Sequence, residues 1–207
     1  MDKGILIFAF CIAIVGRALG QSPYYVNHSE IGALVGKTPS DDQRVNFSIQ
    51  SFNGIRVNPQ HQLGLLVGID SYRDFTMVPL AVGWRGLLAK GKKNSPYERL
   101  DLYTSIDLGH SSAVFEKRII QDQFESWYQG GLFFSPAIGI RKHSKYSPMA
   151  YSWSVGYKRQ HASHYNGTRQ GGLPPSPPDD DLPPGFSSIN RDSFIFNSLF
   201  FRFGLIF

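Results

Sequence analysis

The chain has 207 residues, of which 42% are hydrophobic and 18% are charged, and its formal net charge is +5. This length suits one domain with a targeting segment, and the scattered charge speaks against a nucleic-acid partner. A single cysteine, Cys11, excludes a disulfide framework.

The N-terminal segment has the layout of a secretory signal peptide. Lys3 precedes an uninterrupted apolar run from Ile5 to Val15, and small residues lead to Gly20. The run is shorter than the roughly 18 residues typical of a transmembrane helix. The sequence therefore predicts a cleaved signal peptide at residues 1–20 and an exported mature chain. Cys11 lies within the apolar run, so the mature chain has no thiol nucleophile.

After the signal peptide, apolar and polar residues alternate in about eight segments. The clearest is Val45 to Gln50, where every odd residue is apolar and every even residue is polar. The other segments lie, in chain order, near residues 28–36, 62–70, 78–85, 100–109, 132–140, 149–158 and 199–207. This pattern predicts an all-β fold, an antiparallel up-and-down β-barrel of about eight strands. Ala113 to Tyr128 is the nearest approach to helical spacing, and we expect a short helix or a long loop there.

Alternation alone does not separate a soluble barrel from a membrane barrel. The strand segments are about as long as a tilted strand needs to cross a bilayer, roughly 9–11 residues. Large aromatic residues such as Trp84, Trp153 and Tyr157 lie on the apolar face, as in interfacial aromatic girdles. Both features favour a transmembrane barrel with a polar interior.

The polar face should fill the interior of such a barrel. The residues expected to point inward are Asn46, Ser48, Gln50, Arg85, Asp101, Tyr103, Asp107 and Arg202. Because an eight-stranded barrel has room only for side chains, we expect a paired Arg/Asp network there and no diffusion channel.

The last segment adds a more specific signal. Leu199, Phe201, Phe203, Leu205 and Phe207 share one face, and the chain stops at Phe207. This pattern resembles the C-terminal strand of small bacterial outer-membrane β-barrels. The resemblance implies a Gram-negative outer-membrane location, contact with outer-membrane lipid and lipopolysaccharide, and recognition of this strand by the barrel-assembly machinery. The position of Gln21, directly after the predicted cleavage site, also resembles outer-membrane barrels of Bacteroidetes type.

The connectors suggest an orientation. With a periplasmic N-terminus, the two longest connectors, residues 110–129 and 160–192, lie outside the cell, as long barrel loops do. We expect them to be surface loops that could meet an extracellular ligand. The second contains a proline-rich and acidic stretch from Leu173 to Pro184, which predicts an extended arm.

The segment His161-Ala162-Ser163 is similar to part of the lipid A deacylase family of outer-membrane barrels. That similarity implies Ser163 as the nucleophile and His161 as its base, both on the lipid side. His164 stands where the family has an asparagine, and the only acidic candidate on the next strand is Asp192. His161 and His164 alone make a poor metal site, and we expect neither a metal nor a cofactor.

Three functions remain open from the sequence. The leading hypothesis is a non-enzymatic outer-membrane β-barrel with exposed loops for binding or surface-structural work. The second is a lipid-modifying serine esterase that uses His161 and Ser163. The third is a soluble exported ligand-binding barrel.

Overall fold

The computed structural model describes residues 24–38, 42–91, 99–114, 119–121, 124–143, 149–169 and 186–207. Within them the chain forms nine strands: β1 (Tyr25–Lys37), β2 (Gln43–Arg56), β3 (His61–Ser71), β4 (Thr76–Ala89), β5 (Leu100–Val114), β6 (Ile119–Gln121), β7 (Phe124–His143), β8 (Ala150–Arg169) and β9 (Phe186–Ile206). The predicted signal peptide and the proline-rich stretch lie outside the described residues. Among the described residues, no helix is long and apolar enough to span a membrane.

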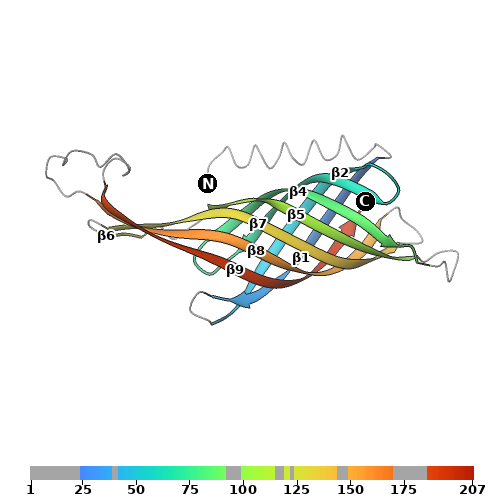
Figure 1. Ribbon diagram of the computed structural model, residues 1–207. Coiled ribbons are helices and arrows are strands. Elements are labelled where there is room, and N and C mark those ends of the chain that lie inside the picture. The colour runs from blue at the N-terminus through green and yellow to red at the C-terminus, as the bar shows by residue number, and fades with distance from the viewer. Residues whose placement is uncertain are drawn as a thin grey trace.

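Eight of these strands close into a ring (Figure 1). Each strand pairs antiparallel with its neighbours in the chain, β5 pairs with β7, and β1 pairs with β9. The short β6 pairs only with the start of β7. The predicted all-β, up-and-down barrel is confirmed, and the C-terminal strand closes it: Asn27 and Phe207 exchange backbone hydrogen bonds of 2.8 and 3.0 Å.

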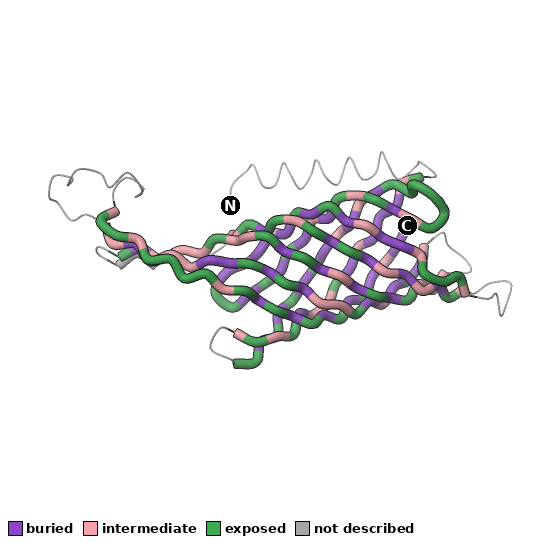
Figure 2. Tube along the Cα trace, in the orientation of Figure 1, coloured by how far each residue is buried: buried purple, intermediate pink, exposed green. Residues whose placement is uncertain are grey.

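Buried and exposed residues alternate along the strands (Figure 2). The exposed side chains include a large apolar residue from every strand of the ring, for example Ile31, Phe47, Leu65, Val82, Leu108, Ile138, Val155 and Phe201. All eight residues that the sequence placed in the lumen are buried, with at most 7% of their surface exposed. We call these exposed apolar side chains the apolar belt. A soluble ligand-binding barrel has the inverse arrangement, with its apolar side chains pointing inward.

Small residues make room for the large groups inside. A Cβ on Gly83 would lie 2.5 Å from the Asp107 carboxylate and 3.0 Å from the Phe52 ring. A Cβ on Gly139 would lie 2.7 Å from the Tyr103 ring. Because these contacts are too short for a Cβ, glycine at these positions allows the backbone to approach the buried aromatic and charged side chains closely.

Two expectations about the connectors were wrong in the described residues. The segment 113–128 forms no helix: β5 continues to Val114, β6 follows, and β7 begins at Phe124. Likewise, much of 160–192 is strand, because β8 continues to Arg169 and β9 begins at Phe186. Strand structure thus replaces much of both expected surface loops.

These longer strands leave the ring together at one end. The β1–β9 pairing stops at Gly36↔Ser198 and the β5–β7 pairing at His110↔Leu132, but β7, β8 and β9 remain paired with one another beyond those points. We call this part the extension: β6, residues 124–130 of β7, 161–169 of β8 and 186–195 of β9. It projects from the barrel on the side opposite the C-terminus (Figure 1).

The strands of the extension differ in how regularly they pair. The β8–β9 ladder runs from Ala150↔Ile206 to Arg169↔Phe186, with one shift at its far end. The β7–β8 ladder contains a register shift between Gly130 and Phe133, where the barrel passes into the extension. Such a bulge changes which β7 side chains share a face with β8.

Candidate functional site

The barrel interior is held together by buried ion pairs. Arg85 donates to both carboxylate oxygens of Asp107, at 2.6 and 3.3 Å, and the side chains are 1% and 2% exposed. Lys158 donates to Asp70, and both residues are also buried. The predicted Arg/Asp pairing is therefore confirmed for Arg85 and Asp107, and the Lys158–Asp70 pair adds to it. Arg202 forms no ion pair among the described residues.

A third carboxylate, Glu30, lies near the middle of this network. It accepts hydrogen bonds from Gln50 at 2.7 Å and from Ser154 at 2.8 Å, and His28 lies 3.5 Å away. Arg202 stacks on the Phe200 ring, with 3.7 Å from its guanidinium carbon to the ring centre. These contacts fill the lumen with polar and aromatic groups, which is the arrangement expected of a structural interior.

Aromatic side chains close the end of the lumen next to the extension. Phe75, from the β3–β4 turn, stacks on Tyr128 at 4.5 Å and on Tyr72 at 5.0 Å. Tyr72 in turn stacks on Phe196 at 5.0 Å, and Arg44 lies over both of these rings. This cluster separates the charged interior from the extension.

The structure places His161 and Ser163 on β8 where the extension begins. His161 is exposed, while Ser163 is only 6% exposed, because Ser193 and Arg191 of β9 cover it. The Ser163 hydroxyl lies 3.2 Å from the Ser193 hydroxyl and accepts hydrogen bonds of 3.3 Å from Arg191. No hydrogen bond between described residues joins His161 to Ser163. The two residues occupy neighbouring positions on one face without forming a nucleophile–base pair.

A different serine and histidine do meet on the extension. The Ser126 hydroxyl lies 2.6 Å from Nε2 of His164, and the His164 ring stacks on Tyr128 at 4.5 Å. Asp192 is the register partner of His164 on β9. A serine within hydrogen-bond distance of a histidine is the minimal arrangement for an activated nucleophile. In the described residues, no group of three or more His, Cys, Asp or Glu residues could hold a metal ion.

The opposite face of the extension carries an aromatic cluster that we call the aromatic platform. Trp127 stacks on Tyr165 at 5.3 Å with an interplanar angle of 4°, and Phe186 lies 5.5 Å from Trp127. Arg191 lies over the Tyr165 ring at 5.6 Å. Stacked aromatic rings beside an arginine provide a rigid surface with both apolar and hydrogen-bonding groups.

Sequence reasoning missed Ser126, Trp127 and Arg191 because each gains its role from strand register. Ser126 and His164 are 38 residues apart, and Arg191 reaches Ser163 across 28 residues. The bulge at residues 130–133 further shifts the β7 side chains relative to β8. For Ser126 and Trp127, the aromatic and polar residues between 124 and 129 were the signal available before the register was known.

No protein-family model matches the chain, and no curated protein matches it. Among solved structures, the chain is similar to the crystal structure of Neisserial surface protein A (NspA), with 14% sequence identity and a TM-score of 0.46 over 89% of this chain and 96% of that chain.

Proposed function

We propose that the chain is a non-enzymatic outer-membrane β-barrel that holds its extension outside a Gram-negative cell as a binding surface. The observation that carries this proposal is the apolar belt, which surrounds a barrel whose charges are buried. A soluble monomer rarely exposes a contiguous apolar patch of more than a few hundred Å². In a bilayer the same belt contacts lipid chains, and the closed ring leaves no strand edge unpaired there.

The chain ends support an orientation for the barrel. The start of β1 and the end of β9 lie together at the end opposite the extension. With both on the periplasmic side, the extension enters the lipopolysaccharide layer and the space beyond it. We further propose that outer-membrane lipid and lipopolysaccharide surround the barrel, and that the assembly machinery recognises the strand ending at Phe207.

The aromatic platform is the part of the extension best suited to binding. Aromatic residues and arginine are enriched where proteins recognise partners. Tyrosine and tryptophan give a large contact area at a low cost in side-chain entropy, and arginine adds hydrogen-bond donors. Trp127, Tyr165 and Phe186 are half-buried, and Arg191 is exposed beside them. In place of part of the expected surface loops, the extension thus offers a preorganised surface.

Localisation provides the first test. The full chain expressed in a Gram-negative host should be recovered in the outer-membrane fraction. Unboiled samples should run at a different gel mobility from boiled ones, because the closed barrel resists detergent until heated. Purified protein in planar bilayers should conduct no steady ion current, since side chains fill the lumen. Recovery in the soluble periplasmic fraction, with no heat-modifiable mobility, would refute the proposal.

A second candidate function, a lipid-modifying serine hydrolase, is favoured by the contact between Ser126 and His164. In this candidate the His164 ring removes the hydroxyl proton as Ser126 attacks an ester carbonyl, and the same ring protonates the departing alcohol. Water, deprotonated by His164, then cleaves the acyl-serine ester, which releases the fatty acid and restores Ser126. The similarity to the lipid A deacylase family instead implies Ser163 as the nucleophile and His161 as its base. Both serines lie on the extension, where acylated lipid of the outer leaflet is within reach in the proposed orientation.

Mass spectrometry of lipid A distinguishes these two serines. If the Ser126–His164 pair is catalytic, wild-type protein should remove an acyl chain, Ser126→Ala should abolish the change, and Ser163→Ala should retain it. Ser188→Ala, at an exposed position on the same strand as Arg191, is the matched control. Loss of activity in Ser163→Ala alone would assign the site to Ser163. An unchanged acylation pattern with wild-type protein removes the hydrolase candidate altogether.

A further inference from the structure

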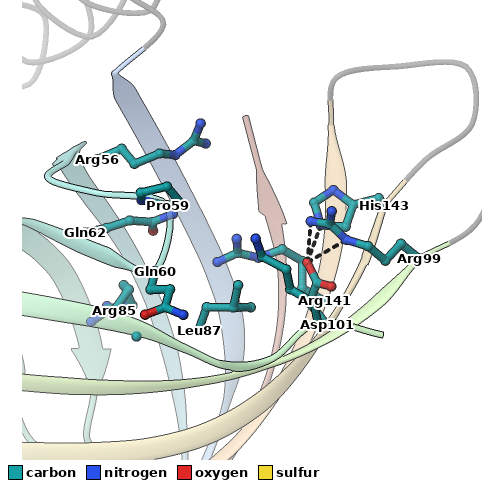
Figure 3. Close-up of a pocket in the computed structure, with 12 residues that line it drawn as sticks. Arg56, Pro59, Gln60, Gln62, Arg85, Leu87, Arg99, Asp101, Arg141 and His143 are labelled. Atoms are coloured by element: carbon teal, nitrogen blue, oxygen red, sulfur yellow. Dashed lines mark hydrogen bonds and ion pairs between the residues drawn. The ribbon is translucent and has the colours of Figure 1, made fainter. Parts of the chain in front are cut away.

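A cavity of about 410 Å³ lies at the end of the barrel opposite the extension. Its walls come from the β2–β3 turn, the end of β4, the start of β5 and the end of β7 (Figure 3). Arg56, at the end of β2, donates its backbone N–H to Tyr24 at 2.6 Å, which places the cavity beside the start of β1. This site is distinct from the aromatic platform.

The cavity lining is strongly basic. Its Arg and Lys residues are Arg56, Arg85, Lys90, Arg99 and Arg141, and its single carboxylate is Asp101. One oxygen of Asp101 is already engaged, because it accepts hydrogen bonds from Arg99 at 2.6 Å and from His143 at 2.9 Å, drawn as dashed lines in Figure 3. Its other oxygen accepts the Gly91 N–H at 3.3 Å. Asp101 therefore has little capacity left for the remaining cations.

Three of the basic groups form no ion pair in the part of the chain that the structure describes. Arg85 is paired with Asp107 and Arg99 with Asp101, but no ion pair there joins Arg56, Lys90 or Arg141 to a carboxylate. The Arg141 guanidinium carbon lies 5.4 Å from the centre of the Tyr103 ring. The Arg141 Nε is shielded from solvent and has no hydrogen-bond partner among the described residues.

A buried amide also lines the cavity. Gln62 is only 8% exposed, and its side-chain oxygen has no partner among the described residues. Buried polar groups are normally satisfied by protein, water or ligand. The Gln62 oxygen is an acceptor and takes no part in binding an anion, so the donors that the lining offers are its Arg and Lys side chains and the Gln62 amide nitrogen.

We propose that this cavity binds a phosphate group. Guanidinium groups match the oxygens of an oxyanion with paired N–H donors, and the cavity lining includes such groups from β2 and β7. A phosphate monoester carries a charge of about −1.5 to −2 at neutral pH. That charge suits three unpaired cations better than the single charge of a carboxylate. A cavity of this size holds a small ligand or one lipid headgroup.

Two sources could supply this phosphate. Ile55, Val57 and Leu88 are exposed apolar residues next to the lining residues in sequence, so a lipid headgroup at the membrane surface is one source. A soluble phosphate in the periplasm is the other. The chemistry at the cavity is the same in both cases, and separate probes distinguish them.

The test uses the full protein extracted from membranes in an uncharged detergent at about 150 mM salt, where long-range attraction between charges is screened. Isothermal titration calorimetry with inorganic phosphate measures soluble binding, with acetate as the carboxylate comparison. Native mass spectrometry with a short-chain phosphatidic acid measures headgroup binding. We expect Arg141→Gln to weaken binding of the recognised probe by about tenfold or more.

Arg159→Gln is the matched control. Arg159 is exposed on the outer face of β8, and its substitution removes the same charge as Arg141→Gln. It should leave phosphate affinity unchanged. If Arg141→Gln does not form a heat-modifiable barrel, Arg56→Gln carries the test, since Arg56 is exposed at the end of a strand. The proposal is overturned if neither phosphate probe binds, if acetate binds as tightly as phosphate, or if Arg159→Gln weakens binding equally.

Discussion

Replacing Asp107 with alanine is expected to lower the free energy of unfolding by roughly 3–5 kcal/mol. Arg85 is 1% exposed in its side chain and relies on Asp107 for two hydrogen bonds. Without the carboxylate, the guanidinium remains buried beside the Phe52 ring, 4.4 Å away, with no counter-charge in contact. Denaturant unfolding of the barrel refolded into lipid vesicles measures the change.

The control removes both charges together. In the double variant Arg85→Met/Asp107→Ala no ion is left unpaired, so much of the stability lost in Asp107→Ala should return. Asp192→Ala, at an exposed position of β9, should change stability by less than about 0.5 kcal/mol. If Asp107→Ala changed stability no more than Asp192→Ala, the buried pair would contribute nothing to the fold.

Phe201→Arg is expected to cost about 2–4 kcal/mol in a bilayer, the cost of an arginine at the membrane midplane on the lipid face of a barrel. Phe201 is 58% exposed and lies between its register partners Ala33 and Val155 in the apolar belt. In water a surface substitution of this kind would be nearly neutral. Unfolding from lipid vesicles therefore tests directly whether the belt contacts lipid.

Ile195→Arg is the matched control for this prediction. Ile195 is on the same strand and is also exposed, but it lies in the extension, about 20 Å along β9 from Phe201 at the rise of a β-strand. An arginine there should cost only about 0–1 kcal/mol, the cost near the membrane edge. Equal losses from Phe201→Arg and Ile195→Arg would contradict a membrane position for the belt.

The strands within the apolar belt could be predicted from the sequence because their two faces meet different surroundings. Phe201 and Arg202 are neighbours in the chain, yet one is exposed and the other is buried, and the residue types alternate accordingly. Asp107 and Arg85 could be placed in the lumen for the same reason. Their direct pairing required the β4–β5 register, in which Gly83 lies opposite Asp107.

The extension could not be predicted in this way. From Gln160 to Arg169 the sequence is polar on both faces, because both faces of the extension lie outside the apolar belt, and such a segment looks like a loop. The bulge after Gly130 also breaks the simple alternation of β7. The contact between Ser126 and His164 and the basic cavity both join segments that are distant in the chain, so neither has a local signature.

The continuous β8–β9 ladder has a mechanical consequence. It begins at Ala150↔Ile206 inside the ring and continues without a break to Thr168↔Ser188 in the extension. A force applied to the tip of the extension would pull both strands in the same direction, so it would shear the pair against its neighbours β7 and β1 and would not separate β8 from β9. The extension would therefore transmit tension directly to the barrel wall, which the bilayer would anchor in the proposed membrane location.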